Sequence, residues 1–258
     1  MAGSVARISI APVKSLGLVH PDRVDLELGG VRGDRRFWLV DDHGRLYNNK
    51  RNGPLQAIHP DWDEATHELT LTFPDGATVG GTVELGRPFT AVLYGHPHLS
   101  RPVVGPWQAA ISAHADEPLT LLWSESHATD RGAVGGDVSL ISRASLRRLG
   151  EEADAPEPVD GRRFRMMLEL DGVDAHEEDA WIGSRIRVGG AEVLVNGDIG
   201  RCVVTSQHPD TGISDLDTLG TLARYRREGR VEPLPFGIYG SVTSAGPVAI
   251  GDEVRLLG

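Results

Sequence analysis

Short apolar runs and strictly alternating segments dominate the first third of the chain, and both patterns predict β-strands. The clearest alternation covers residues 67–73 (HELTLTF), where two leucines and Phe73 fall on one side and two threonines on the other. A Pro-Asp-Gly turn follows it, and an Asp-His-Gly turn separates two other runs, as in hairpins. Strands at this spacing predict a small barrel. The predicted strands are residues 5–13, 36–41, 45–48, 67–73 and 77–85.

The middle of the chain divides two β-rich parts. Residues 94–106 (YGHPHLSRPVVGP) have the composition of a loop, and residues 107–115 predict a short helix. We place a domain boundary near Asp116, so that residues 1–115 form one unit and residues 116–258 the other. Beyond it we expect a helix capped by Ser142, another beginning near residues 215–217, and strands at 119–123, 163–170, 185–188, 191–195, 202–206, 234–242 and 248–257. The predicted fold class is mainly β (α+β), with two packed β-barrel-like units and a few short helices.

Composition narrows the possible partners. The 258 residues include 32 glycines and 16 prolines, which favours short strands over long helices. Lys and Arg number 26 against 37 Asp and Glu, and the net charge of −11 argues against nucleic acid or an anionic membrane as the main partner. No apolar run is long enough to span a membrane, and the N-terminus lacks the apolar core of a signal peptide. One cysteine cannot form an internal disulfide, so a cytoplasmic location is expected.

That single cysteine is the first candidate for chemistry. Cys202 heads an apolar run directly after a glycine-rich turn at residues 196–200, and Arg201 precedes it. A neighbouring arginine favours the thiolate, which is the form that binds metals and attacks electrophiles. The alternative is a buried cysteine that acts as a small apolar side chain. The residues around Cys202 leave both interpretations open.

Cationic clusters are the second candidate. Each stands at a predicted strand end or turn, where side chains can converge on the mouth of a pocket. Arginine forks match the geometry of phosphate, and backbone amides in glycine-rich turns add donors. The clusters therefore predict a pocket for a small anion, and the alternative is a set of solvated surface charges. They are Lys14-Ser15, Asp34-Arg35-Arg36, Arg162-Arg163-Phe164-Arg165 and Arg201.

The order of motifs along the chain resembles the MOSC family, named after the C-terminal domain of molybdenum-cofactor sulfurases. The resemblance covers nearly the whole chain. It implies that residues 1–115 form the family's N-terminal β-barrel domain and residues 116–258 the MOSC domain. The motifs are PVKS (12–15), GDRRFWLVD (33–41), RRFR (162–165), GRCVVTSQHPDTG (200–212), LxTLxxYR (219–226), FGIYG (236–240) and GDEV (251–254).

The resemblance implies a molybdenum cofactor (Mo-molybdopterin), with Cys202 as the catalytic residue and the protein ligand of the metal. A soft thiolate suits molybdenum that a pterin dithiolene already holds. The family's remaining cofactor contacts fall on Lys14, Ser15, Arg36, Arg165, Gly200, Arg201 and Tyr239. Gly135 and Gly136 are further candidate contacts, but they stand where the family has Ser or Thr, so only their backbone amides could bind the cofactor. Departures from the family's pattern are Met166 after Arg165, where a polar residue is common, and Asp198 or Ile199 where some relatives have a second cysteine.

Three functions stay open at this point. The first is an oxidoreductase that reduces N-hydroxylated compounds; since one cysteine cannot hold an iron–sulfur cluster, its electrons would come from separate partner proteins. The second is a sulfur carrier or sulfurtransferase with a persulfide on Cys202. The third is a non-catalytic protein that binds the molybdenum cofactor. Pyridoxal phosphate, which some descriptions of the family mention, ranks low because no lysine is marked as a Schiff-base former. The oligomeric state is left open.

Overall fold

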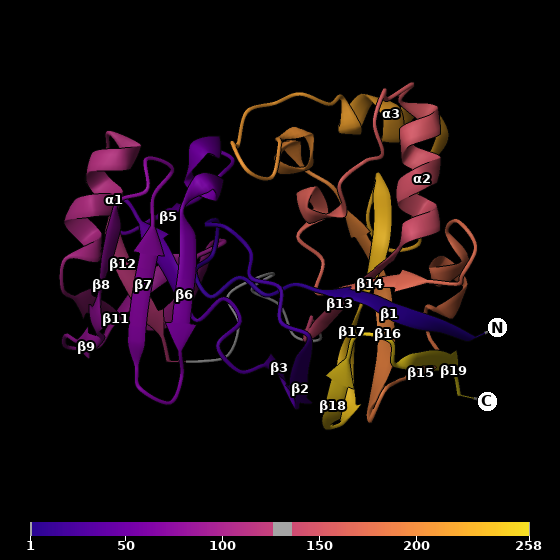
Figure 1. Cartoon of the computed structure of the whole chain (residues 1–258), viewed down its shortest axis with the longest axis horizontal. Coiled ribbons are helices and arrows are strands. Elements are labelled where there is room, and N and C mark those ends of the chain that lie inside the picture. The colour runs from indigo at the N-terminus through magenta and orange to yellow at the C-terminus, as the bar shows by residue number, and fades with distance from the viewer. Residues whose placement is uncertain (1, 126–135, 258) are drawn as a thin grey trace.

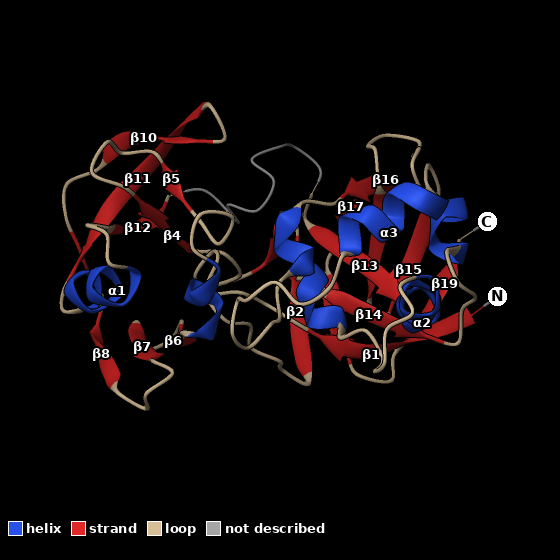
Figure 2. Cartoon of the chain, turned by 90° about the horizontal axis from the view of Figure 1, so that it is seen from above, coloured by secondary structure: helices blue, strands red, loops and turns tan. Residues whose placement is uncertain are grey.

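The computed structural model describes residues 2–125 and 136–257 (Figure 1). Over these residues the chain is mainly β, with three short α-helices and a few 3-10 turns, so the predicted fold class is confirmed. Two β-rich units lie side by side along the long axis of the molecule (Figures 1 and 2). Both chain ends lie at the outer end of the C-terminal unit.

The C-terminal unit is built on a closed barrel of seven strands. All neighbouring pairs are antiparallel except β13 with β14. Closure leaves no open sheet edge and encloses an apolar core that includes Val5, Leu140 and Val193. In barrel order the strands are β1 (Ala2–Ile8), β14 (Leu168–Asp171), β13 (Val138–Ser142), β17 (Pro235–Ser244), β16 (Ala191–Gly200), β15 (Arg185–Val188) and β19 (Glu253–Leu256).

Two open sheets form the N-terminal unit. One runs β10-β11-β12-β4-β5 with β9 beside β11, and the other runs β6-β7-β8. The predicted alternation is confirmed in β7, where Leu69 and Leu71 are buried in a core that also contains Trp107 and Ile111 of α1 (Trp107–Ala115). The strands are β4 (Phe37–Val40), β5 (Leu46–Tyr47), β6 (His59–Asp63), β7 (Glu68–Thr72), β8 (Thr78–Thr82), β9 (Glu84–Leu85), β10 (Phe89–Leu93), β11 (His96–Val104) and β12 (Thr120–Ser124).

The loop predicted at residues 94–106 is wrong, because most of it is strand β11. Tyr94 and Gly95 both have positive φ, and they make the tight turn of a hairpin with β10. Pairing with β10 on one side and β12 on the other holds the segment extended despite its prolines. Neighbouring strands thus outweighed a loop-like composition.

The sheets do not divide at residue 116. Strand β1 lies in the closed barrel, and β12 pairs with β4 of the N-terminal unit. Each unit therefore includes a strand from across the proposed boundary, which ties the two units together. A small third sheet, of β2 (Arg23–Glu27), β3 (Gly30–Val31) and β18 (Gly246–Ala249), also joins early and late parts of the chain.

Two helices cover one end of the barrel (Figures 1 and 2). Helix α2 (Arg143–Glu152) begins after Ser142, whose side chain accepts from the Ser145 amide at 3.0 Å, so the predicted cap is confirmed. Helix α3 (Thr218–Tyr225) begins after Asp217, whose carboxylate accepts from the Gly220 amide. None of the described helices has the length and apolarity needed to cross a membrane.

A histidine is packed against α3 and the barrel. His176 precedes the 3-10 turn η3 (Glu177–Trp181), and its ring lies 5.8 Å from the Tyr225 ring and 5.9 Å from the Phe236 ring. Burial lowers the pKa of His176 to about 4, and the charges of Arg226 and Arg148 act in the same direction. Among the described residues, no partner bonds either ring nitrogen.

His176 is therefore expected to weaken the fold in acid. Below the ordinary pKa of 6.5 the unfolded chain binds a proton that the folded chain does not accept until about pH 4. The free energy of unfolding should fall across that interval, and His176→Asn should remove this part of the fall. Asparagine tolerates the positive φ of 63° at this position. Urea unfolding of both proteins at pH 7 and pH 4.5 tests this, and parallel declines would contradict it.

Candidate functional site

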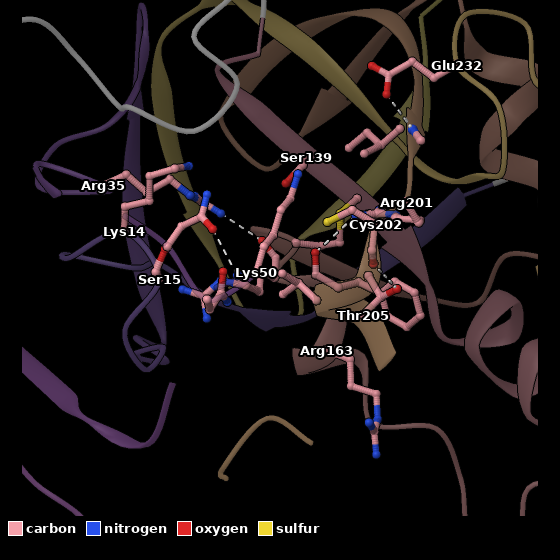
Figure 3. Close-up of a pocket in the computed structure, with 18 of the residues that line it drawn as sticks. Lys14, Ser15, Arg35, Lys50, Ser139, Arg163, Arg201, Cys202, Thr205 and Glu232 are labelled. Carbon is pink, nitrogen blue, oxygen red and sulfur yellow. Dashed lines mark hydrogen bonds between the residues drawn. The ribbon is translucent and has the colours of Figure 1, made fainter. Parts of the chain in front are cut away.

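A cavity of about 410 Å³ opens where the two units meet (Figure 3). This volume falls within the usual range for small-molecule sites. The wall is strongly cationic, and Glu232 is the only carboxylate among its described residues. The cationic residues of the wall are Lys14, Arg35, Lys50, Arg163, Arg165 and Arg201.

Cys202 lines this cavity and is partly exposed, so it is not a buried apolar filler. It follows the end of β16 and precedes the 3-10 turn η4 (Val203–Ser206), so the predicted strand at 202–206 is wrong. The Cys202 carbonyl accepts from both the amide and the hydroxyl of Thr205, each at 3.0 Å. These bonds close a turn that holds the backbone while the thiol stays available to the cavity.

Arg201 connects the turn that begins at Cys202 to two neighbouring segments through hydrogen bonds. Its guanidinium donates to the Phe236 carbonyl at 2.7 Å and to the Phe164 carbonyl at 3.3 Å, and it lies over the Phe164 ring. It also donates to the Met166 sulfur at 2.9 Å. Arg201 thus places a positive charge beside Cys202 and also fixes the position of the turn.

Two arginines link the units across the cavity. Arg35 donates to the carboxylate of Asp34 and, at 2.9 Å, to the Arg165 carbonyl, while Arg165 donates to the Leu16 carbonyl at 2.7 Å. Both arginines have positive φ, 48° and 53°, as does Ser15 at 77°. Such conformations are uncommon outside glycine and mark tight turns that the surrounding structure imposes.

Lys14 lies on the wall of the cavity opposite Cys202 and Arg201. Its amide donates to the Phe37 carbonyl at 2.7 Å, which anchors the PVKS segment beside β4. Its ammonium lies 5.1 Å from the ring of Tyr94, at the tip of the β10–β11 hairpin. The N-terminal unit therefore contributes both a cation and an aromatic surface to the cavity.

The structure brings six of the predicted site residues together in the wall. The others differ: Arg36, Gly136 and Tyr239 are not in the wall, and Gly135 lies outside the described residues. Arg36 packs instead over the Trp123 ring at 4.1 Å. Arg35 lies in a turn with a positive φ just before β4, and the conformation of this turn, rather than strand alternation, directs Arg35 to the cavity and Arg36 to Trp123. The six are Lys14, Ser15, Arg165, Gly200, Arg201 and Cys202.

Several wall residues were not singled out from the sequence. Arg35 and Arg163 stood in the cationic clusters, but nothing marked them above their neighbours. Arg163 pairs with both carboxylate oxygens of Asp215, at 2.5 and 2.8 Å, and Figure 3 shows it directed away from Cys202. The remainder have no local signal, because they reach the cavity only through folding: Asn48, Asn49, Lys50, Tyr94, Ser139, Phe164, Met166, Ile199, Val204, Thr205 and Glu232.

The donor set suits an anionic cofactor that carries its own metal. The described wall offers one thiol and one carboxylate, so a metal bound here needs most of its ligands from a chelating group. The Lys and Arg side chains match the negative charge of such a group. The cavity therefore fits a metal–pterin complex with a phosphate.

Comparison with known families agrees with the motifs. The family model of the MOSC domain matches residues 127–255, and that of the MOSC N-terminal beta barrel domain matches residues 2–95. The chain therefore belongs to the MOSC domain family, and the resemblance seen in its motifs is confirmed.

Two kinds of named relative match this chain. Mitochondrial amidoxime-reducing component 1 is 32% identical in Mus musculus and 27% identical in Homo sapiens, in each case over 99% of this chain and 83% of the relative. Molybdenum cofactor sulfurase 1 of Aedes aegypti is 25% identical over 95% of this chain and 34% of the relative. Among solved structures, the YUAD protein from Bacillus subtilis has 14% identity and a TM-score of 0.47, over 98% of this chain and 94% of that one.

Proposed function

We propose that this protein binds a molybdenum cofactor in the cavity, with Cys202 as the protein ligand of the metal, and that it reduces N-hydroxylated compounds. The observation that carries the proposal is a partly exposed thiol in a cavity whose wall contains six Lys and Arg residues. Relatives named for amidoxime reduction, matched over 99% of this chain, support the reaction class.

The chain's own residues bind and orient. Lys14, Arg35 and Arg165 neutralise the anionic groups of the cofactor, and Ser15 adds a hydroxyl. Arg201 and Thr205 hold the Cys202 turn, so the sulfur keeps one position. When bound, the cofactor supplies the two-electron reduction of the N–OH group. Separate partner proteins deliver the electrons for this reduction. A cytoplasmic location of the protein stays a prediction from the sequence.

Metal analysis combined with a reductase assay tests this proposal. Protein produced in a bacterial host that makes the cofactor should contain an equimolar amount of molybdenum and should convert benzamidoxime to benzamidine with a reduced viologen as electron donor. Protein from a host unable to make the cofactor is the control and should do neither. Cofactor binding without any turnover would instead identify a non-catalytic cofactor-binding protein, and absence of molybdenum would refute the proposal.

Sulfur transfer is the second candidate, because the same partly exposed thiol is accessible to a donor. Relatives named as sulfurases, matched over 95% of this chain, favour it. A donor such as thiosulfate would pass one sulfane sulfur to the Cys202 thiolate and leave as sulfite, giving a persulfide. Mass spectrometry should then find one added sulfur that cyanide removes as thiocyanate. An unmodified Cys202 after incubation with the donor argues against this function.

A further inference from the structure

Glu232 differs from every other charged residue in the described wall of the cavity, because it alone is an acid. It lies on the C-terminal side, close to the strand end that leads to Cys202 (Figure 3). At the end of the cavity that contains Cys202, a carboxylate therefore accompanies the positive charge of Arg201, whereas the charged residues of the opposite wall, Lys14 and Arg35, are both cations. The two ends of the cavity therefore attract different chemical groups.

The position of this carboxylate is fixed from two sides. Asp198, only 2% exposed, accepts from three successive amides, those of Arg230, Val231 and Glu232, at 2.5, 3.1 and 2.8 Å. The Glu232 carboxylate in turn accepts from the Gly200 amide at 2.9 Å. A Cβ on Gly200 would lie 2.7 Å from that same carboxylate oxygen and 2.8 Å from the Pro233 carbonyl oxygen, and because the latter is backbone, this close approach favours glycine.

The reaction proposed above changes the charge of its substrate. A neutral amidoxime, R–C(NH₂)=N–OH, takes up two electrons and three protons; its N–O bond breaks, the oxygen leaves as water, and an amidinium cation remains. A viologen reductant supplies the electrons in the assay, and solvent supplies the protons. A carboxylate meets an amidinium as it meets the guanidinium fork of arginine, through two parallel hydrogen bonds.

We propose that Glu232 binds the amidine end of the substrate and stabilises the positive charge that forms there; this inference rests on the proposed function. The contact grows stronger as the N–O bond breaks, so it contributes more to the transition state than to the bound substrate. Glu232 thereby selects N-hydroxylated compounds whose reduced product is a cation.

If Glu232 acts only as the acceptor for the Gly200 amide, its charge should not matter for the reaction, and this can be distinguished from a role of the charge. Glu232→Gln keeps a side-chain oxygen that can accept from the Gly200 amide, but it removes the charge. The matched control is Glu228→Gln, which removes the same charge from an exposed residue nearby that is not in the wall of the cavity. Both variants should bind molybdenum and unfold as the unaltered protein does.

The test compares two substrates with the holoprotein and a reduced viologen. Benzamidoxime gives a cationic product, whereas phenylhydroxylamine gives aniline, which is neutral at pH 7. Glu232→Gln should lower kcat/KM for benzamidoxime about tenfold, the size expected for a partly screened charge pair, and should leave phenylhydroxylamine within about twofold. Equal losses on both substrates, or none on either, would overturn the inference.

A binding measurement separates this inference from the proposed function. Calorimetry should show that benzamidine, the cationic product, binds about tenfold more weakly to Glu232→Gln than to the unaltered protein or to Glu228→Gln. Failure of the unaltered protein to reduce either substrate would refute the proposed function. The calorimetry with benzamidine would still test whether Glu232 binds an amidinium. Equal benzamidine affinity in all three proteins would refute the role of Glu232.

Discussion

Replacement of Cys202 by alanine is expected to remove molybdenum from the purified protein and to lower benzamidoxime reduction at least about a hundredfold, because a metal–thiolate bond contributes more than the outer contacts whose loss costs up to that factor. The fold should survive. The Cys202 carbonyl, rather than its thiol, accepts the two bonds from Thr205, so the free energy of unfolding should change by less than about 0.5 kcal/mol.

The control for this experiment is the neighbouring Val203→Ala. Val203 is 44% exposed and is not in the described wall of the cavity, so its truncation should leave metal content and turnover unchanged. Metal analysis, viologen-linked kinetics and urea unfolding of all three proteins give the result. A Cys202→Ala protein that keeps both its molybdenum and its turnover would show that the thiol is not a ligand.

Replacement of Gly212 by alanine is expected to destabilise the protein by about 3–5 kcal/mol. Gly212 has a φ of 70°, and a Cβ there would lie 1.9 Å from the Gly53 carbonyl oxygen, which is backbone and cannot move aside. This contact joins the loop after η4 to the 3-10 turn η1 (Gly53–Ala57) of the N-terminal unit. Beside it, Gln207 donates to the Asn49 carbonyl at 2.8 Å.

Gly44→Ala provides a close control for Gly212→Ala. Gly44 has the same φ of 70°, but a Cβ there would meet nothing within 4 Å. It should therefore cost only the conformational penalty, about 1 kcal/mol. Urea unfolding of both variants isolates the cost of the steric contact between the units. Equal destabilisation would mean that the two loops separate without cost, and that the cavity between the units is not rigidly defined.

Local patterns were enough to predict individual elements. The short helix at residues 107–115 has the predicted bounds, and the β4–β5 hairpin lies within the predicted strands. These depend on periodicity and turn residues, which act over a few positions of the chain. The helix capped by Ser142 is confirmed as well, and it runs to Glu152.

Longer-range pairing decided the elements that the patterns missed. Residues 96–104 are a strand because β10 pairs with residues 96–100, β12 with residues 100–102 and β9 with residues 103–104. Residues 203–206 are a turn because Thr205 bonds back to the Cys202 carbonyl. In each case the same apolar or polar run is compatible with more than one conformation, and contacts outside the run select one of them.

The sequence by itself determined that the protein is mainly β, which family it belongs to, and that one cysteine and several Lys and Arg residues are the candidates for its site. Composition, alternation and motif order are properties of the chain alone, so they need no tertiary structure. Only the tertiary structure decided which cations face Cys202. It replaced Arg36 by Arg35 and brought in Lys50 and Glu232 from distant loops. The physical reason is that a cavity forms where two packed units meet, and which side chains face it depends on the register of each strand and the conformation of each turn.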